Sequence, residues 1–296
     1  MEHMTAAVSC FARAYHYRHS LHPVFADSAA KALLGNDYDE IAAHMTAGIP
    51  FFLPGFTGSP EEGLQRIVTG QLAPSVLIRS AFSENLLHQE IVHGCRQVVI
   101  PACGYDTFGI RNTNTDVLVF ELDLPELIED KQRRIRQAGL SSSSVYIPCD
   151  LSSPSWKTSL QANDFRLDQS AFCSLLGISY YLEKEAFRNL LQVLNELLCK
   201  SSSICFDYPS DEDGIESQLN RSLARGAGEE MKARYSRNEM EDLLSACGFQ
   251  CVSHIDCHEA TKQFCSAYNE SCPAFPITAP SGVCYMHARN HKPRSL

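Results

Sequence analysis

The sequence lacks any hydrophobic run long enough to cross a bilayer, and its first residues lack the charged-then-apolar order of a secretory signal. It also lacks a surplus of basic residues: 25 Lys and Arg stand against 35 Asp and Glu, a formal net charge of −10. A nucleic-acid backbone calls for clustered cations, and the short basic stretch at 289–294 is better explained as a solvated terminus. We therefore expect a cytoplasmic protein whose partners include neither membrane nor nucleic acid.

Cysteine is plentiful, with thirteen residues, but no two of them have the spacing C-x-x-C. Because their number is odd and the chain is large, we expect reduced thiols and no disulfide framework. Cys173, Cys199, Cys205 and Cys284 have apolar neighbours and are expected to pack as small core residues. With 44% hydrophobic and 20% charged residues, the 296-residue chain has ample material for a large core.

The hydrophobic pattern changes near residue 97. Before it, helical periodicity dominates and no convincing strand occurs, which predicts an N-terminal helical cap over 1–93. After it, strands alternate with helices, which predicts a doubly wound, mostly parallel sheet over 94–296 within one structural unit. The expected strands are Gln97–Ile100, Val117–Leu122, Val145–Ile147, Ala171–Leu176, Ser203–Phe206, Phe249–Ile255 and Val283–Ala288, the last two forming a closing antiparallel pair.

The loop after the first of these strands is the expected ligand site, because such sheets bind ligands at the carboxyl ends of their strands. Gly104 lies in this loop and has no Cβ, so a ligand can approach its backbone closely. Asp106 and Thr107 are candidates to cap a following helix whose N–H groups would face the site.

Acidic residues follow the next two expected strands. Asp123 comes nineteen positions after Gly104, where a carboxylate can accept hydrogen bonds from both ribose hydroxyls of an adenosine. Asp150 follows the third strand and is placed to accept from an adenine amino group, while Leu151 is placed to cover the ring. Each feature alone is equally explained as a turn or a helix cap, but their order together favours a nucleotide-type site.

A dinucleotide-dependent dehydrogenase is the natural competitor. Its loop requires G-x-G-x-x-G, whereas the corresponding positions here are Ala102, Gly104 and Thr107. Without the third glycine, and without a pyrophosphate to bind, an adenosine that carries no phosphate fits this loop better.

The whole chain resembles the leucine carboxyl methyltransferase family, including its microbial branch of tetracenomycin-type O-methyltransferases that act on small molecules. Members carry a segment like V-V-x-L-G-A-G-x-D-T and, about twenty residues later, F-E-x-D-x-P. The matching residues are Val98–Thr107, Phe120–Pro125, Lys131, Asp150-Leu151, Tyr181-Leu182 and Gly248-Phe249. The resemblance therefore extends over nearly the full length.

The resemblance implies a Rossmann-like class I methyltransferase that uses S-adenosylmethionine and releases S-adenosylhomocysteine. The methyl group would pass to an oxygen, carboxylate or hydroxyl, of a small molecule or a peptide C-terminus. Arg79 occupies the place of an arginine that binds the methionine carboxylate, and Arg13 that of a second basic residue over the cofactor. Leu124, next to Asp123, belongs to the same expected cofactor set. For Arg13 the alternative is a solvated helix face.

Two departures from the family pattern affect this site. Ala102 replaces the first glycine of G-x-G, and Leu176 replaces the glutamate of E-G-x-x-x-Y-L. Both lie where the methionine part of the cofactor is expected. They motivate an alternative in which the chain binds S-adenosylmethionine without catalysing transfer and acts through protein partners.

A carboxylate acceptor needs no base, whereas a hydroxyl acceptor must lose a proton. The candidate groups are Tyr180, Tyr181, Asp207, Tyr208 and the histidines His16, His19 and His22. For most of them a structural role is the better explanation, with Tyr180 and Tyr181 packing beside the site. The three histidines have helical spacing, but no carboxylate or cysteine completes a zinc site near them, so we expect no metal. The stretch 209–235, with Gly226-Ala227-Gly228-Glu229-Glu230, is expected to be a lid over the acceptor.

Overall fold

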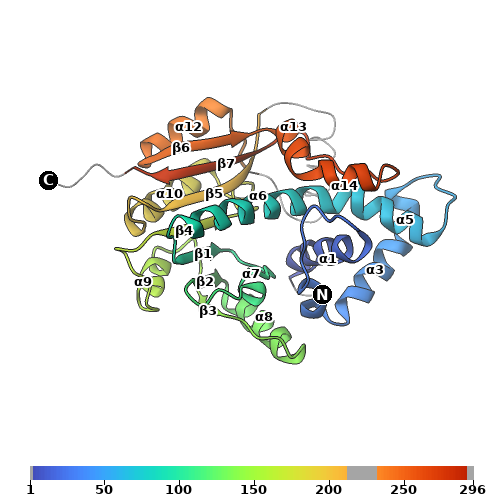
Figure 1. Cartoon of the computed structure of the whole chain (residues 1–296), viewed down its shortest axis with the longest axis horizontal. Coiled ribbons are helices and arrows are strands. Elements are labelled where there is room, and N and C mark those ends of the chain that lie inside the picture. The colour runs from blue at the N-terminus through green and yellow to red at the C-terminus, as the bar shows by residue number, and fades with distance from the viewer. Residues whose placement is uncertain (1–2, 212–231, 292–296) are drawn as a thin grey trace.

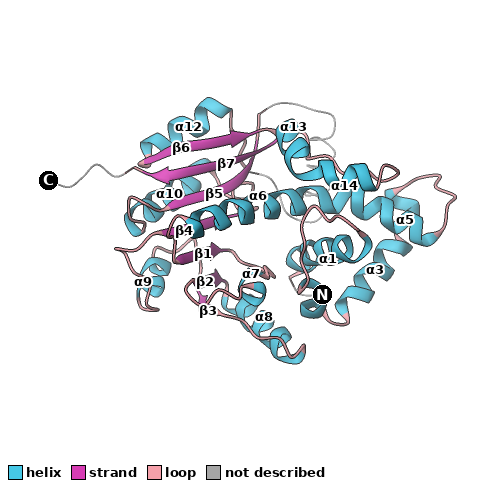
Figure 2. Cartoon of the chain, in the orientation of Figure 1, coloured by secondary structure: helices cyan, strands magenta, loops and turns pink. Residues whose placement is uncertain are grey.

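The computed structural model describes residues 3–211 and 232–291. Its centre is a seven-stranded sheet with the strand order β3-β2-β1-β4-β5-β7-β6 (Figures 1 and 2). The first five strands are mutually parallel, and β7 runs antiparallel to both β5 and β6. Their bounds are β1 Gln97–Pro101, β2 Leu118–Asp123, β3 Ser144–Pro148, β4 Ala171–Leu175, β5 Ser203–Pro209, β6 Phe249–Ile255 and β7 Val283–Asn290.

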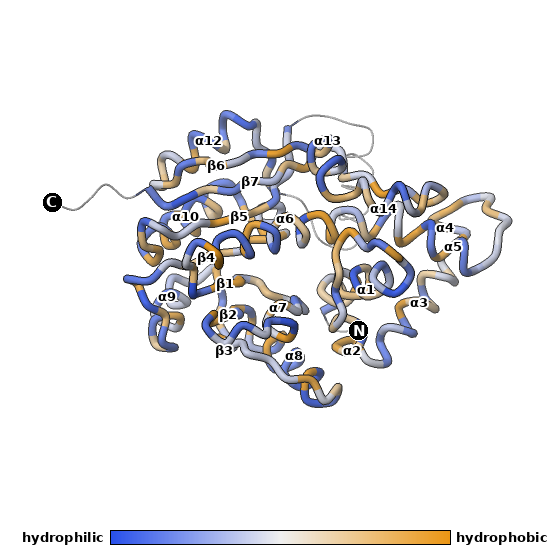
Figure 3. Tube along the Cα trace, viewed as in Figure 1, coloured by the Kyte–Doolittle hydropathy of each residue, from blue (hydrophilic) through white to orange (hydrophobic). Residues whose placement is uncertain are grey.

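Between residues 3 and 93 the described chain is helical. The elements there are α1 Met4–His19, α2 Ala30–Leu34, α3 Asp37–Ala47, α4 Ile49–Phe52, α5 Pro60–Ile67, the π-helical turn η1 Val68–Leu72, and α6 Ala73–Val92. Most of these helices lie together at one end of the molecule, while α6 extends from them along the sheet (Figure 1). The first half of α6 has hydrophobic colours where it passes this group (Figure 3).

The remaining helices connect or flank the strands. They are α7 Phe108–Arg111, α8 Pro125–Gln137, α9 Ser155–Gln161, α10 Lys184–Leu197, α12 Arg237–Ala246, α13 Cys257–Ala260, η2 Thr261–Cys265 and α14 Ser266–Ser271. Apolar residues at helical spacing explain how α10 packs, because all of its buried side chains lie on one face. These are Phe187, Leu190, Leu191, Leu194 and Leu197.

Two hydrophobic clusters cover the two faces of the sheet. Successive residues of β1 alternate between them: Val98 and Ile100 belong to one cluster and Val99 to the other. The first cluster also contains Leu77 and Phe82 of α6 and side chains of α1, whereas the second contains those of α10 and α12. The N-terminal helices therefore share a core with the sheet.

The expected α/β fold, with a closing antiparallel pair, is confirmed. All thirteen cysteines lie in the described ranges as free thiols; Cys173 and Cys205 are fully buried, Cys284 is buried and Cys199 half-buried. Within those ranges, no helix combines the length and apolar character that a membrane crossing requires.

Candidate functional site

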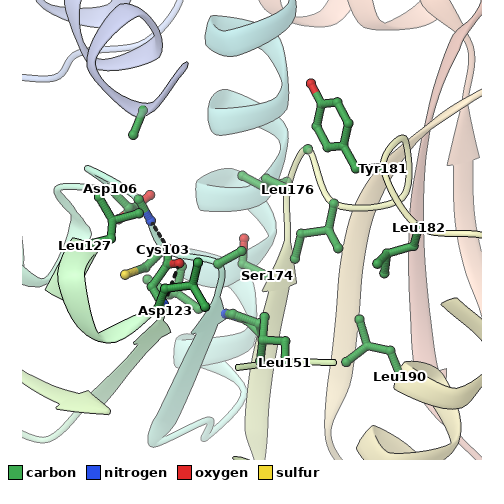
Figure 4. Close-up of a pocket in the computed structure, with 18 of the residues that line it drawn as sticks. Cys103, Asp106, Asp123, Leu127, Leu151, Ser174, Leu176, Tyr181, Leu182 and Leu190 are labelled. Carbon is green, nitrogen blue, oxygen red and sulfur yellow. Dashed lines mark hydrogen bonds between the residues drawn. The ribbon is translucent and has the colours of Figure 1, made fainter. Parts of the chain in front are cut away.

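A cavity of about 1210 Å³ opens at the carboxyl ends of the parallel strands. Cys103, Asp106 and Asp123 lie on one side of it, and Tyr181, Leu182 and Leu190 on the other (Figure 4). The volume exceeds the roughly 300–1,000 Å³ of ordinary small-molecule pockets. There is room for two ligands side by side.

The loop after β1 and the end of β2 are joined by the carboxylate of Asp123. The backbone N–H of Gly104 donates to Oδ2 at 2.8 Å, and the N–H of Leu124 donates to Oδ1 at 2.8 Å. Only 9% of Asp123 is exposed, and its burial raises the pKa of the carboxyl group, although the two backbone hydrogen bonds oppose this shift. The side chain is therefore fixed with one edge on the cavity, where a carboxylate still has lone pairs to accept from hydroxyl groups.

The backbone of this loop is left-handed at two positions. Gly104 has φ +48° and Ala102 has φ +50°. Glycine adopts this conformation freely, but an alanine Cβ is strained there by about 1 kcal/mol. Ala102 also lines the cavity. The replacement of the family's glycine thus adds both strain and bulk at this wall.

The helix expected after this loop is present as a single turn, α7. α7 has only four residues, and Oδ1 of Asp106 accepts from the N–H of Phe108 at 2.7 Å. Thr107 makes no capping hydrogen bond, because its Oγ1 accepts instead from Nε of Arg111 at 2.9 Å. Asp106 lines the cavity, but a single turn presents few N–H groups to a ligand.

Three further residues of the expected adenosine set line the cavity, namely Leu124, Asp150 and Leu151. Asp150 is exposed, and hydrogen bonds from Ser152 lower the pKa of its carboxyl group, so it is ionised at neutral pH. The two leucines add apolar surface beside these acids, which suits a flat heterocycle with polar edges.

The cavity wall beside the loop after β4 holds a cation. Arg79 of α6 lines the wall together with Leu176 and Gly177 of the loop after β4. Nη1 of Arg79 lies 3.9 Å from Oδ2 of Asp207. Leu176 contributes apolar surface at the position where the family has a glutamate. This position therefore supplies no carboxylate near the positive charge of Arg79.

Arg13 is buried, which contradicts the alternative of a solvated helix face. Its Nε donates to Oδ2 of Asp27 at 2.8 Å, and its Nη2 donates to the backbone oxygen of Tyr105 at 2.6 Å. Arg13 also lines the cavity, so it ties α1 to the β1–α7 loop at the edge of the site.

Two of the three tyrosines expected as catalytic candidates do not line the cavity. Tyr180 donates to Oδ2 of Asp207 at 3.0 Å, and Tyr208 is hydrogen-bonded to Nε2 of His254 at 2.9 Å. Burial raises the pKa of both phenols, well above the ordinary value for Tyr180, so neither is suited to act as a base. Asp207 is fully buried and also lies off the cavity; Tyr181 lines it.

His16 has a structural role. Its Nε2 accepts from the N–H of Val24 at 2.9 Å, and its Nδ1 is hydrogen-bonded to Ser20 at 3.2 Å. Burial lowers the pKa of the ring to about 4. His19 stacks on Tyr15, and the described residues contain no group of three His, Cys, Asp or Glu side chains arranged to hold a metal.

The tertiary structure adds walls that sequence reasoning missed. The first two turns of α1 contribute Met4 and Ser9, and one face of α10 contributes Asn189, Leu190 and Val193. No local motif marks these residues, since they reach the cavity only when distant helices pack. The expected lid over 209–235, including Gly226–Glu230, falls almost entirely outside the described residues.

The sheet order and the position of the cavity define a class I methyltransferase fold with a site for a nucleoside-like ligand. The leucine carboxyl methyltransferase model matches residues 6–195, more than half of the chain. The chain therefore belongs to the leucine carboxyl methyltransferase family of S-adenosylmethionine-dependent methyltransferases.

Individual relatives agree with this assignment. The chain is 29% identical to the "Putative S-adenosyl-L-methionine-dependent methyltransferase YktD" of Bacillus subtilis, over 96% of this chain and 97% of that protein. It is 27% identical to a protein of the same description from Mycobacterium marinum, over 75% of this chain and 69% of the relative.

Solved structures support the fold alone. A DUF574 family protein from Streptomyces avermitilis aligns with a TM-score of 0.55 at 13% identity, covering 83% of this chain and 96% of its own. A "putative methyltransferase" from Thermobifida fusca aligns with a TM-score of 0.50 at 13% identity, covering 95% of this chain and 94% of its own.

Proposed function

We propose that this protein transfers the methyl group of S-adenosylmethionine to an oxygen atom of a small molecule or a peptide C-terminus. The observation that carries the proposal is a single cavity lined both by the Asp123 carboxylate, which Gly104 holds by a hydrogen bond, and by the Arg79 guanidinium. A carboxylate for ribose hydroxyls and a guanidinium for an amino-acid carboxylate match the two polar ends of this cofactor.

Each lining residue has an expected task toward the cofactor. Asp123 accepts from the ribose hydroxyls, Asp150 accepts from the adenine amino group, and Leu124 and Leu151 cover the ring. Arg79 binds the methionine carboxylate. Three further residues line the part of the cavity for the methionine moiety, namely Ala102, Leu176 and Arg13. When bound, S-adenosylmethionine supplies an electrophilic methyl group on a sulfonium.

The contribution of the chain to the reaction is chiefly orientation. Holding donor and acceptor in line at near-attack distance supplies much of the rate enhancement, and a carboxylate acceptor needs no proton removed. The cavity volume supports a bound acceptor beside the cofactor, and of the three candidate tyrosines Tyr181 lines the cavity. Because the chain resembles tetracenomycin-type O-methyltransferases, we propose that it belongs to this microbial branch, which modifies small molecules.

A second function is favoured by two replacements where the methionine part of the cofactor is expected. Ala102 stands in place of a glycine and Leu176 in place of a glutamate. In this alternative the protein binds S-adenosylmethionine without transfer and acts through partners. The two functions separate in an assay with methyl-labelled cofactor and a panel of carboxylate and phenol acceptors. Label in a product supports the transferase, and binding without transfer to any acceptor supports the alternative.

Calorimetric titration tests the cofactor site directly. We expect S-adenosylmethionine to bind and NAD not to bind. Asp123→Ala should weaken S-adenosylmethionine binding roughly tenfold or more, because hydrogen bonds to a charged group are lost. Asp116→Ala is the matched control, since Asp116 is exposed and does not line the cavity. Equal affinity in the two variants would remove the ribose assignment.

A further inference from the structure

Asp207 is a carboxylate in the hydrophobic core. It lies near the carboxyl end of β5, opposite Tyr285 of β7, and is fully buried. A buried carboxylate is costly unless donors surround it. Two donors meet it directly: the N–H of Gly177 binds Oδ1 at 2.7 Å, and the hydroxyl of Tyr180 binds Oδ2 at 3.0 Å.

The third partner of Asp207 is a cation that reaches the cavity. Nη1 of Arg79 is 3.9 Å from Oδ2, and the side chain of Arg79 is 21% exposed whereas that of Asp207 is 0% exposed. Arg79 lines the cavity and Asp207 does not. The ion pair therefore runs from the core to the wall of the site, with the negative member hidden from any ligand.

Gly177 packs closely against the same guanidinium. Its φ is +69°, and a Cβ at this position would lie 2.6 Å from Nη1 of Arg79. The absence of a side chain thus leaves the space that the guanidinium occupies. The same glycine donates its N–H to Asp207. One carboxylate is therefore hydrogen-bonded to the loop after β4 and ion-paired with Arg79.

We infer that Asp207 is a positioning residue that orients the Arg79 guanidinium toward the carboxylate of the cofactor's methionine part. The inference rests on the proposed function. An arginine carries five N–H donors, and pairing at Nη1 leaves the others to bind a ligand. Because the side chain is already held, less rotamer freedom is lost when the ligand carboxylate binds. Asp207 itself touches no ligand.

The test compares two probes that differ only in the relevant group, S-adenosylmethionine and decarboxylated S-adenosylmethionine. Calorimetry on the full chain should show that the wild type prefers the carboxylated probe roughly tenfold or more. Asp207→Asn should reduce this preference toward that of Arg79→Gln, and the double variant should show no further reduction. A purely structural role would weaken both probes alike and leave their ratio unchanged.

Glu90→Gln is the matched control. Glu90 is also a buried carboxylate paired with an arginine, at 2.6 Å from Nη2 of Arg289, and it lies eleven residues along α6 from Arg79 and off the cavity. Its variant should keep the wild-type preference. Asp207→Glu gives a second measurement should the asparagine variant not fold: it keeps the charge but shifts the carboxylate, so the preference should fall.

The possible results distinguish the role of Asp207 from the cofactor site itself. A wild-type preference that survives in Asp207→Asn or Asp207→Glu overturns the role of Asp207 while the cofactor site stands. Equal binding of the two probes by the wild type overturns both the inference and the assignment of Arg79 to the methionine carboxylate, while the binding of S-adenosylmethionine itself stands. If the wild type binds neither probe, the proposed function itself fails.

Discussion

At the scale of single residues, Ala102 is the most informative position of the site. It has φ +50° and lines the cavity. A side chain in this conformation is strained, and the strain persists only because the surrounding structure over-determines the backbone. Here Cys103, the next residue, donates its N–H to the backbone oxygen of Leu122 at 3.1 Å, which ties the loop to β2.

Replacing Ala102 with glycine should therefore stabilise the protein. We expect Ala102→Gly to raise the free energy of unfolding by about 1 kcal/mol, because the left-handed conformation is unstrained for glycine. It should not lower the affinity for S-adenosylmethionine, since the variant only removes bulk from the wall. Urea denaturation and calorimetry measure the two quantities.

A matched substitution in a helix should have the opposite sign. Ala43 is exposed within α3, and Ala43→Gly should lower the free energy of unfolding by about 1 kcal/mol. A loss of stability in both variants would show that Ala102 is not strained in the protein in solution.

At the scale of elements, the attachment of α1 to the sheet depends on buried charge. Asp27 accepts from Arg13 at 2.8 Å and lies 3.6 Å from Nε of Arg111, and its Oδ1 accepts from the N–H of Ala30 at 3.0 Å. Arg13 in turn donates to the β1–α7 loop. The first turns of α1, which line the cavity, are thereby fixed over the site.

Removing Asp27 should loosen this attachment. We expect Asp27→Ala to lower the free energy of unfolding by at least about 3 kcal/mol, because it leaves Arg13 buried without its carboxylate. The affinity for S-adenosylmethionine should fall as well. Urea denaturation and calorimetry are the measurements.

The pair Arg66–Glu62 provides the comparison, since its side chains are 48% and 40% exposed. Glu62→Ala should change the free energy of unfolding by less than about 1 kcal/mol. A similar small effect for Asp27→Ala would mean that α1 is held by apolar packing alone.

The spacing of hydrophobic residues in the sequence predicted the strands well. The seven expected strands are observed with ends shifted by a few residues at most. Buried side chains repeat at helical or strand spacing, and this repeat is local in sequence. The helix expected after Thr107 is observed as α7, a single turn that ends at Arg111 before the loop that leads into β2.

At the scale of the whole molecule, two buried histidines couple stability to pH. Burial lowers the pKa of His16 to about 4; it does the same for His287, with a further contribution from Arg289. Between about pH 6.5 and 4 the unfolded chain binds protons at these rings that the folded chain does not. Acidification through this window therefore lowers the free energy of unfolding, and below it the effect levels off.

Each ring should contribute about 1–2 kcal/mol of lost stability between pH 7 and pH 5. We expect His16→Gln to reduce this pH dependence, since glutamine does not titrate and still offers an acceptor to the N–H of Val24. Urea denaturation of wild type and variant at the two pH values measures the difference. An unchanged pH dependence in the variant would exclude His16 as a source.

Residue types at short spacings predicted the strands, the loop at Gly104 and the acids Asp123 and Asp150, because each of these features depends on one strand and the turn that follows it. The packing of the elements sets the rest of the site. Tyr180 and Tyr208 lie off the cavity, and Asp207 is paired with Arg79. These contacts link residues that are distant in sequence, so they depend on how helices and strands pack, which no local pattern encodes.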